Sequence, residues 1–250
     1  MLGSHYADFL SSCGANLILL DIDDIENKKL EKLISSKHDT KIRSYTCDIS
    51  NPDEIRLVKN KILKDYKKID VLINNAAYTT KSVITEKKKK IIFEKFPFEM
   101  WQKSLDVNLT GVFLTSKEFG EIMLKQKSGN IINISSIYGI VGSDQRIYDN
   151  SEFNLPISYA ATKGSIINLT RYLAAYWHRK NIRVNTLSLG GVYDSSFHKA
   201  NFVKKYSEKT ILGRMGHIDD FDGASLYLIS DASSYVTGAN LVVDGGWTAW

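Results

Sequence analysis

Two short stretches decide the fold: GNIINISS at residues 129–136 and YAATK at residues 159–163. The first contains an apolar run typical of a buried strand, followed by serine hydroxyls where the strand ends. The second places Tyr159 and Lys163 one helical turn apart, so that both side chains lie on one face of a helix. Because open parallel sheets bind ligands at the carboxyl ends of their strands, the two stretches predict an α/β fold with a site beside Ser136.

Tyr159 and Lys163 form a candidate acid–base pair. A tyrosine has an ordinary pKa of about 10, so it exchanges protons poorly at neutral pH unless a nearby positive charge favours the phenolate. Lys163 is placed to supply that charge. A tyrosine and a lysine at this spacing are more often a lysine stem lying over an aromatic ring, so the pair needs support from the rest of the chain.

Further motifs accompany the pair in a fixed order. They are Asn74-Asn75-Ala76-Ala77, Val107-Asn108-Leu109-Thr110-Gly111, Ser136, Val236-Thr237-Gly238 and Val243-Asp244-Gly245-Gly246. In these motifs the chain resembles the short-chain dehydrogenase/reductase family, from Gly3 to Trp250. The resemblance implies one domain over residues 1–250 with a Rossmann-like, doubly wound parallel sheet. It also implies an oxidoreductase that uses a nicotinamide dinucleotide to interconvert a secondary alcohol and a ketone.

The resemblance also implies the catalytic residues. Ser136 would hold the substrate oxygen, Tyr159 would exchange its proton, and Lys163 would bind the nicotinamide ribose and lower the pKa of Tyr159. Asn108 lies in the middle of a predicted helix, where asparagine is a weak helix former. Its implied role is to distort that helix and position a water bonded to Lys163.

Cofactor-binding residues are implied along most of the chain. They are Gly3, Asp21, Asp48, Ile49, Asn75, Ala76, Tyr159, Lys163, Gly190 and Val192. Asp21 follows an apolar run, and an acidic residue there accepts hydrogen bonds from the adenosine ribose and repels a 2′-phosphate. The cofactor is therefore expected to be NAD, with NADP the less favoured choice. Without the resemblance, Asp21 could equally be one of several acids that open a polar loop.

Asp48 would contact the adenine amino group. Alternatively, Asp48 or Ser50 could cap the helix that begins at Pro52, a good residue for a first helical turn. Both roles could coexist, because different atoms serve them.

The chain departs from the family pattern around the substrate. Leu189 replaces a proline before Gly190, and Asp194 stands where a threonine that bonds the cofactor is expected, with Ser195 or Ser196 as a substitute. The segment between Ser136 and Tyr159 is longer than usual in the family, and the excess lies in residues 143–153. Such a loop would control substrate entry. Residues 196–210 would form a mobile lid.

The resemblance fails at the amino-terminal end. The family pattern opens with a strand and a T-G-x-x-x-G-x-G turn whose amides bind the pyrophosphate, and only Gly3 matches its last glycine. Since that strand is central, its absence is expected to leave two neighbouring strands with unpaired edges. A start upstream of Met1 is favoured by the intact downstream motifs. The alternatives are an inactive remnant and a dinucleotide-binding regulatory protein.

The composition limits the choice of partners. The chain has 250 residues, 43% of them hydrophobic, which is enough for the core of one α/β domain. Its net charge is +5, and the densest basic run is Lys87-Lys88-Lys89-Lys90. Such a run is usually a solvated surface, and no basic stripe interleaved with aromatic residues accompanies it, so we expect no nucleic-acid partner.

The cysteines and the apolar runs predict a cytoplasmic protein. Cys13 and Cys47 have neither metal-ligand spacing nor partners for a disulfide framework, so no metal is expected. No apolar run approaches the ~20 residues of a membrane span, and the amino terminus lacks a signal-peptide pattern. Family members similar over the whole chain imply a sugar or sugar derivative from surface-glycan or flagellin modification as substrate. They also imply a homodimer or homotetramer.

Overall fold

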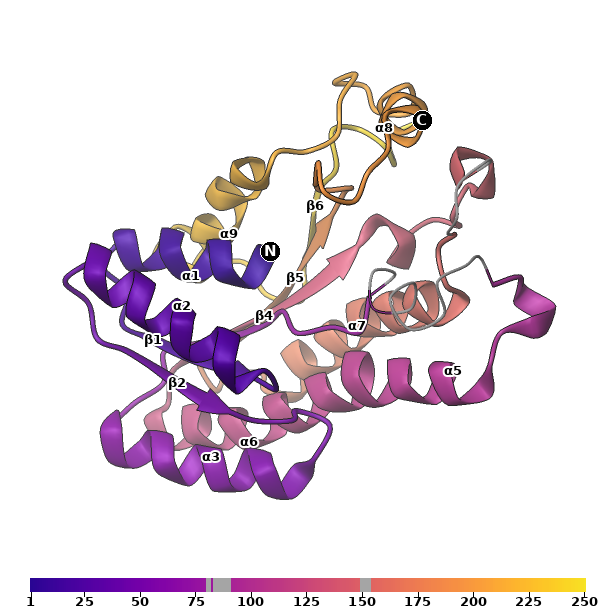
Figure 1. The fold of residues 1–250 in the computed structure, drawn as a ribbon. Helices are drawn as coiled ribbons and strands as arrows, with labels where there is room; N and C mark the ends of the chain where they lie inside the picture. Colours follow the sequence, from indigo (N-terminus) through magenta and orange to yellow (C-terminus); the bar gives the residue numbers. More distant parts are fainter. Residues whose placement is uncertain (80–81, 83–90, 149–153) are drawn as a thin grey trace.

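The computed structural model describes residues 1–79, 82, 91–148 and 154–250 (Figure 1). Its strands are β1 (Leu17–Asp21), β2 (Ile42–Thr46), β3 (Val71–Asn74), β4 (Gly129–Ser136), β5 (Ile182–Leu189) and β6 (Asn240–Val243). Its α-helices are α1 (Leu2–Ser12), α2 (Asp24–Lys37), α3 (Pro52–Asp65), α5 (Phe98–Leu105), α6 (Gly111–Gln126), α7 (Ile157–Tyr176), α8 (Ala200–Ser207) and α9 (Asp222–Ile229). The alternation of helices and parallel strands confirms the predicted α/β fold. The lysine run at residues 87–90 lies outside the described residues, as does part of the predicted insertion, residues 149–153.

The strands pair in parallel in the orders β2-β1 and β3-β4-β5-β6. In the second group, Ile131 of β4 lies in register with Leu72 of β3 and with Val184 of β5. β4 and β5 are almost entirely buried, as expected for parallel strands that are covered on both faces.

The sheet is divided between β1 and β3, as the sequence led us to expect. Among the described residues, each of these strands pairs with one other strand only. The amide of Leu17 donates to the Lys41 carbonyl, and the Cys47 amide donates to the carbonyl of Asp21, so these alternate residues of β1 direct their backbone groups to β2. The backbone groups of Ile18 and Leu20 point away from β2, because successive residues of a parallel strand direct their backbone groups to opposite neighbours.

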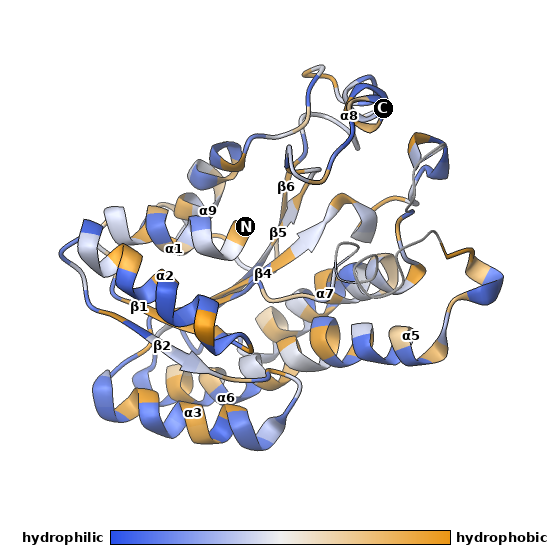
Figure 2. Cartoon of the chain, viewed as in Figure 1, coloured by the Kyte–Doolittle hydropathy of each residue, from blue (hydrophilic) through white to orange (hydrophobic). Residues whose placement is uncertain are grey.

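Helices cover both faces of the sheet (Figure 1). Ile131 packs on one face with residues of α3 and α6, such as Ile55 and Phe119. On the other face, Ile132 packs with α1 and α9, including Tyr6. In Figure 2, α2 and α3 alternate between hydrophilic and hydrophobic residues along their length, as expected for helices with one buried face. None of the described helices combines the length and the hydrophobicity that crossing a membrane requires.

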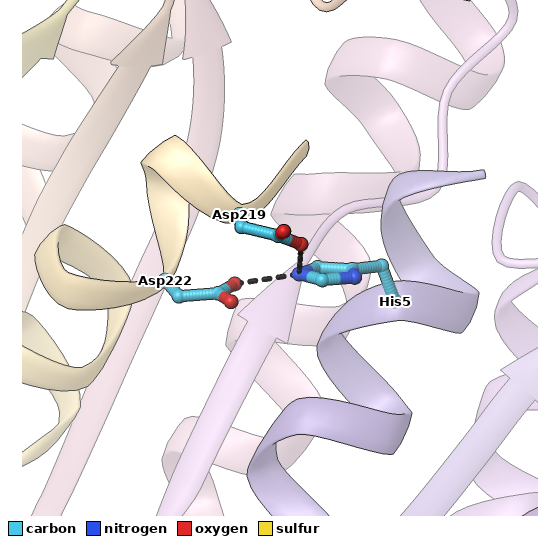
Figure 3. A group of neighbouring side chains, drawn as sticks. All are labelled: His5, Asp219 and Asp222. Carbon is cyan, nitrogen blue, oxygen red and sulfur yellow. Dashed lines mark hydrogen bonds and ion pairs between the residues drawn. The ribbon is translucent and has the colours of Figure 1, made fainter. Parts of the chain in front are cut away.

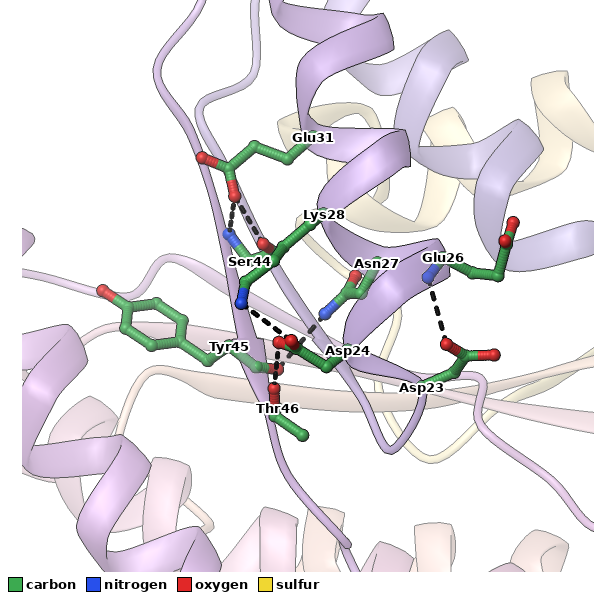
Figure 4. Close-up of polar contacts among 9 residues, drawn as sticks. All are labelled: Asp23, Asp24, Glu26, Asn27, Lys28, Glu31, Ser44, Tyr45 and Thr46. Carbon is green, nitrogen blue, oxygen red and sulfur yellow. Dashed lines mark hydrogen bonds and ion pairs between the residues drawn. The ribbon is translucent and has the colours of Figure 1, made fainter.

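Polar side chains fasten α2 to the β1-β2 pair (Figure 4). The Asn27 side-chain amide donates to the backbone oxygens of Leu19 and Tyr45, both at 3.2 Å. Glu31 accepts a hydrogen bond from the Ser44 amide at 2.8 Å. These contacts hold the carboxyl ends of both strands against one helix.

His5 ties α1 to the start of α9 (Figure 3). Its Nε2 atom lies 2.7 Å from Oδ1 of Asp222 and 3.7 Å from Oδ1 of Asp219, which belongs to the short helix before α9. The shorter separation is that of a hydrogen bond. The cluster therefore fixes α1, whose first turn carries Gly3, over the carboxyl end of the sheet.

Two local predictions need correction. The cap of α3 is Asn51, whose side chain accepts from the Asp53 and Glu54 amides, whereas we expected Asp48 or Ser50. Asn51 directly precedes the first helical residue, so its side chain reaches those amides without a longer loop. In addition, α7 ends at Tyr176 and not near Arg179, because Arg179 adopts a left-handed conformation, with φ 57°, that no helix continues through.

Candidate active site

Lys163 is buried where α7 packs on β4. Only 4% of the residue is exposed, and its Nζ atom donates to the Ile134 carbonyl at 2.7 Å. The Ser135 hydroxyl donates to the Lys163 carbonyl at 2.8 Å, which holds the helix to the strand. A Cβ atom at Gly139 would lie 2.6 Å from the Lys163 backbone, so only glycine permits this close approach. The ammonium of Lys163 lies 5.6 Å from the centre of the Tyr159 ring.

Ser136 lies beside Tyr159, as the sequence predicts. It is the last residue of β4, and its hydroxyl oxygen accepts a hydrogen bond from the Tyr138 amide at 3.2 Å. The Ser136 side chain is near enough to the Tyr159 phenol to lower its pKa. The structure therefore brings together a serine hydroxyl, a phenol and an ammonium from β4 and α7.

Burial shifts the pKa of both titrating groups toward the neutral form. It raises the pKa of Tyr159 above the ordinary value of 10.0, and the hydrogen bond from Ser136 opposes this shift in part. Burial lowers the pKa of Lys163 to about 8. The net shift of the Tyr159 pKa is therefore upward, because desolvation of the phenolate is the dominant effect, and the predicted lowering by Lys163 stays a prediction.

Asn108 lies in a turn of π-helix, Asp106–Thr110, between α5 and α6. This agrees with the predicted distortion, and such turns often occur at functional sites. The side chain is 1% exposed, accepts from the Tyr78 amide at 2.6 Å and donates to the Tyr78 carbonyl at 3.0 Å. It also donates to the Thr162 hydroxyl at 3.3 Å, next to Lys163 in the chain. Its observed contacts therefore fasten a loop and α7 to the helix.

A cavity of about 1490 Å³ connects the predicted cofactor residues. Its lining includes Gly3, Asp21, Asp48, Ile49, Asn75, Ala76, Ser136, Tyr159, Lys163, Gly190 and Val192. The cavity also extends between β1 and β3, which explains a volume above the roughly 300–1,000 Å³ usual for ligand sites. A Cβ atom on Gly3 would lie 2.9 Å from the Asn75 side chain, so a glycine keeps the space between α1 and β3 open. The polar lining residues Asp21, Asn75, Tyr159 and Lys163 fit a dinucleotide.

At one end of the cavity lies Asp21. Its carboxylate ends β1, is exposed and accepts from the Asp23 amide at 2.9 Å. The neighbouring acids are engaged in other contacts: Asp23 accepts from the Glu26 amide at the start of α2, and Asp24 bonds Lys28 (Figure 4). Asp21 is thus the acid at the strand end, where its carboxylate could accept hydrogen bonds from a ribose.

The two asparagines after β3 have different surroundings. Asn74 is buried, donates to the Asn133 side chain at 2.8 Å and accepts from the Thr115 hydroxyl at 2.7 Å, so it joins β3, β4 and α6. Asn75 lines the cavity, as does Ala77, which carries a methyl group where the family has glycine. Asn74 also lines the cavity, but its side chain is buried and bonded to the protein, so Asn75 is the more exposed of the two.

Aromatic residues line the cavity around Tyr159, and local sequence patterns indicated few of them. Tyr138, Tyr148 and Tyr206 line this end with Tyr159. The Tyr138 and Tyr148 hydroxyls are 3.3 Å apart, and Tyr148 comes from the predicted insertion. The contacts join segments that are distant in the sequence, so no local pattern reports them. The only available signal was the Phe-x-x-x-Tyr spacing in α8.

The loop after β5 differs from the prediction at one residue. Neither Ser195 nor Ser196 lines the catalytic cavity, whereas Asp194 does. Asp194 accepts from the Ser196 amide at 2.9 Å and from its hydroxyl at 2.6 Å. The serines therefore do not replace the expected threonine, and the carboxylate occupies that place.

Comparisons with known proteins agree with this geometry. The family model described as enoyl-(acyl carrier protein) reductase matches residues 2–248. The chain belongs to the short-chain dehydrogenase/reductase family. This short-chain dehydrogenase/reductase is 32% identical to "Post-translational flagellin modification protein A" of Campylobacter coli, over 92% of the chain and 87% of that protein. It is 30% identical to "NAD-dependent glycerol dehydrogenase" of Listeria innocua, over 99% of the chain and 89% of that protein.

Solved structures of this family have the same fold. A gluconate 5-dehydrogenase from Burkholderia cenocepacia, in complex with NADP and tartrate, superposes with a TM-score of 0.87 at 26% identity, covering 100% of the chain and 92% of that structure. A short-chain dehydrogenase/reductase from Mycobacterium marinum superposes with a TM-score of 0.86 at 26% identity over the same shares of the two chains. The protein is therefore an oxidoreductase of the short-chain type, a family that binds nicotinamide dinucleotides.

Proposed function

We propose that the chain is an NAD-dependent oxidoreductase that interconverts a secondary alcohol and a ketone on a sugar or polyol. The single observation that carries this proposal is that Ser136, Tyr159 and Lys163 come together on the wall of one cavity whose lining also includes Asp21. A serine hydroxyl and a phenol in contact suit proton exchange with a carbonyl or alcohol oxygen. When bound, the dinucleotide supplies the hydride acceptor for oxidation and the hydride donor for reduction.

Each residue has a distinct task in this proposal. In reduction, the Ser136 hydroxyl donates a hydrogen bond to the ketone oxygen and Tyr159 gives it a proton; in oxidation, the Tyr159 oxygen takes the proton of the alcohol. The raised pKa of Tyr159 keeps the phenol protonated at neutral pH, which suits reduction. The ammonium of Lys163 would hold the nicotinamide ribose and stabilise the phenolate while it exists. Asn108 would hold α7 in place through Thr162.

NAD is proposed over NADP because of Asp21. Its exposed carboxylate at the end of β1 would accept hydrogen bonds from the two ribose hydroxyls and repel a 2′-phosphate. One relative is named as NAD-dependent and one structural neighbour holds NADP, so the choice rests on this residue.

A polyhydroxylated substrate is proposed on two grounds. Relatives at 30–31% identity are named sorbose reductase, NAD-dependent glycerol dehydrogenase and NADH-dependent L-xylulose reductase. In addition, the rings of Tyr138, Tyr148 and Tyr206 line the cavity near Tyr159, and aromatic rings suit the apolar face of a sugar. A role in surface-glycan synthesis is supported by the flagellin modification relative.

The test is a turnover assay with matched variants. The purified chain is incubated with NADH or NADPH and the ketoses L-sorbose or L-xylulose, and with NAD⁺ or NADP⁺ and the polyols glycerol or D-threitol. The absorbance of the reduced cofactor then follows reduction and oxidation, respectively. We expect turnover of at least one pair, lost by about 100-fold or more in Tyr159→Phe and unchanged in Tyr235→Phe, whose ring is fully exposed. Activity above about a tenth of wild type in Tyr159→Phe would exclude Tyr159 as the proton donor. Binding without turnover would favour a regulatory protein.

A further inference from the structure

The loop after β5 is bonded on every side. The Gly190 amide donates to the Val243 carbonyl at 2.8 Å, and the Gly216 amide donates to the Gly191 carbonyl at 3.0 Å. The Gly191 amide donates to the phenol oxygen of Tyr206 at 2.5 Å. Two of these bonds join backbone to backbone, and the third comes from a side chain of α8.

The Tyr206 ring lies directly on the loop backbone. A Cβ atom on Gly191 would lie 2.6 Å from the ring carbon that bears the hydroxyl, so any residue other than glycine would displace the phenol. Tyr206 is itself 2% exposed, and burial raises the pKa of its phenol, so that the group is neutral at neutral pH. The phenol end of this hydrogen bond is therefore buried, and loss of the phenol oxygen leaves the part-buried Gly191 amide without this acceptor.

Tyr206 is itself held from behind. Its ring stacks on that of Trp247, with centroids 4.3 Å apart and an interplanar angle of 29°. Trp247 is 8% exposed and follows β6, in the segment after Asp244. On its own helix, Tyr206 packs against Phe202 at 5.9 Å between centroids. The phenol thus has one position available, which is the position that the Gly191 amide requires.

We propose that Tyr206 is a positioning residue that holds the Gly190-Gly191-Val192 backbone in place for the nicotinamide half of the dinucleotide. This inference rests on the proposed function, because it assigns that half of the cofactor to the cavity wall that the loop forms together with Tyr159. In this chain leucine, and not proline, precedes Gly190, so no pyrrolidine ring stiffens the start of the loop. The Tyr206 hydrogen bond supplies stiffness from α8 instead.

A positioning role for Tyr206 predicts a selective loss of NADH binding, whereas a role in overall stability predicts weaker binding of every ligand. Tyr206→Phe keeps the ring and its stacking on Trp247 but removes the acceptor of the Gly191 amide. By isothermal titration calorimetry, we expect the Kd of NADH to rise by about fivefold or more, while the Kd of ADP-ribose, which lacks nicotinamide, changes by less than about twofold. A loss of overall folding would instead raise the Kd of both ligands. Tyr235→Phe is the matched control, and its two Kd values should equal those of wild type.

A second variant tests the same contact from the other side. Gly191→Ala places a methyl group against the Tyr206 ring. We expect it to raise the Kd of NADH, and not that of ADP-ribose, as Tyr206→Phe does. Since both changes break one contact, the double variant should lose little more than either single variant. The role of Tyr206 would be overturned by any of three results. These are an equal loss of affinity for NADH and ADP-ribose, no loss of NADH affinity, or losses that add up in the double variant. If wild type binds neither ligand, it is the proposed function that fails.

Discussion

The ammonium of Lys163 lies 2.7 Å from the backbone oxygen of Ile134, inside a contact between helix and sheet that leaves 4% of the lysine exposed. A single carbonyl does not compensate for taking an ammonium group out of water, and burial accordingly lowers the lysine pKa to about 8. A destabilised charge beside a phenol is typical of a functional site. Lys163 is therefore expected to lower stability while serving activity.

Replacing this lysine should separate stability from activity. We expect Lys163→Met to raise the free energy of unfolding at pH 7 by roughly 3 kcal/mol, because the shift from 10.5 to about 8 measures the cost of the buried charge. The loss of the bond to Ile134 reduces this gain. Urea denaturation checks the stability, and the turnover assay should show activity lost in the same variant. A variant less stable than wild type would mean that the ammonium is net stabilising.

The same shift predicts a dependence on pH. Because the folded pKa of Lys163 lies below its unfolded value, the unfolded chain binds more protons between pH 8 and 10.5, so the contribution of this lysine to stability rises with pH across that window. The raised pKa of Tyr159 acts in the opposite direction above about pH 10. The stability difference between wild type and Lys163→Met should therefore narrow from roughly 3 kcal/mol at pH 7 to roughly 1 kcal/mol at pH 9.5. Urea titrations at both pH values measure it, and a constant difference would contradict the assigned pKa.

The strands were predictable because their signals are local. The short, mainly apolar stretches at residues 17–20 and 131–134 predict buried strands from their composition and length alone, and both lie inside observed strands. The cap of α3 was mispredicted, although Asn51 is a good capping residue, because Asp48, Ser50 and Asn51 all have suitable side chains. Sequence alone does not tell which of the three reaches the helix amides.

Contacts between distant segments were not predictable. Tyr206 touches Gly191 and Trp247 only because the sheet brings the ends of β5 and β6 side by side. The direction of the Tyr159 pKa likewise depends on burial by the whole fold, which overrides the helical spacing to Lys163. Family motifs did place the predicted cofactor residues on one cavity, and their roles remain predictions.

Asn108 should prove essential for stability. Its side chain bonds both the amide and the carbonyl of Tyr78 in a buried site, so Asn108→Ala removes two buried hydrogen bonds. We expect a loss of roughly 2–4 kcal/mol in the free energy of unfolding, measured by urea denaturation. Asn60→Ala, an exposed change within α3, should alter stability by less than about 0.5 kcal/mol. A small loss in Asn108→Ala would indicate that the π-helical turn forms without this side chain.

Asp21 should decide the choice of cofactor. The wild-type chain is expected to bind NADH at least about tenfold more tightly than NADPH, which is about 1.4 kcal/mol, because the carboxylate repels the 2′-phosphate. In Asp21→Ser the repulsion is removed, and the two Kd values should come within about threefold of each other. Asp24→Ser serves as the control, since its carboxylate is bonded to Lys28 and does not line the cavity. Tighter binding of NADPH by wild type would contradict the reading of Asp21.

The division of the sheet predicts an uneven pattern of hydrogen exchange. β4 and β5 each pair with two strands, whereas β1 and β3 each pair with one among the described residues, so the backbone groups of Ile18, Leu20, Val71 and Ile73 face the cavity between them. Amides in residues 17–21 and 71–74 should therefore exchange at least about tenfold faster than those in β4 and β5, measured by mass spectrometry of peptides from the native chain. The residues of β2, at an outer edge, provide the control for a strand with one neighbour. Protection of β1 and β3 equal to that of β4 would mean that the two edges pair with each other or with another chain in solution.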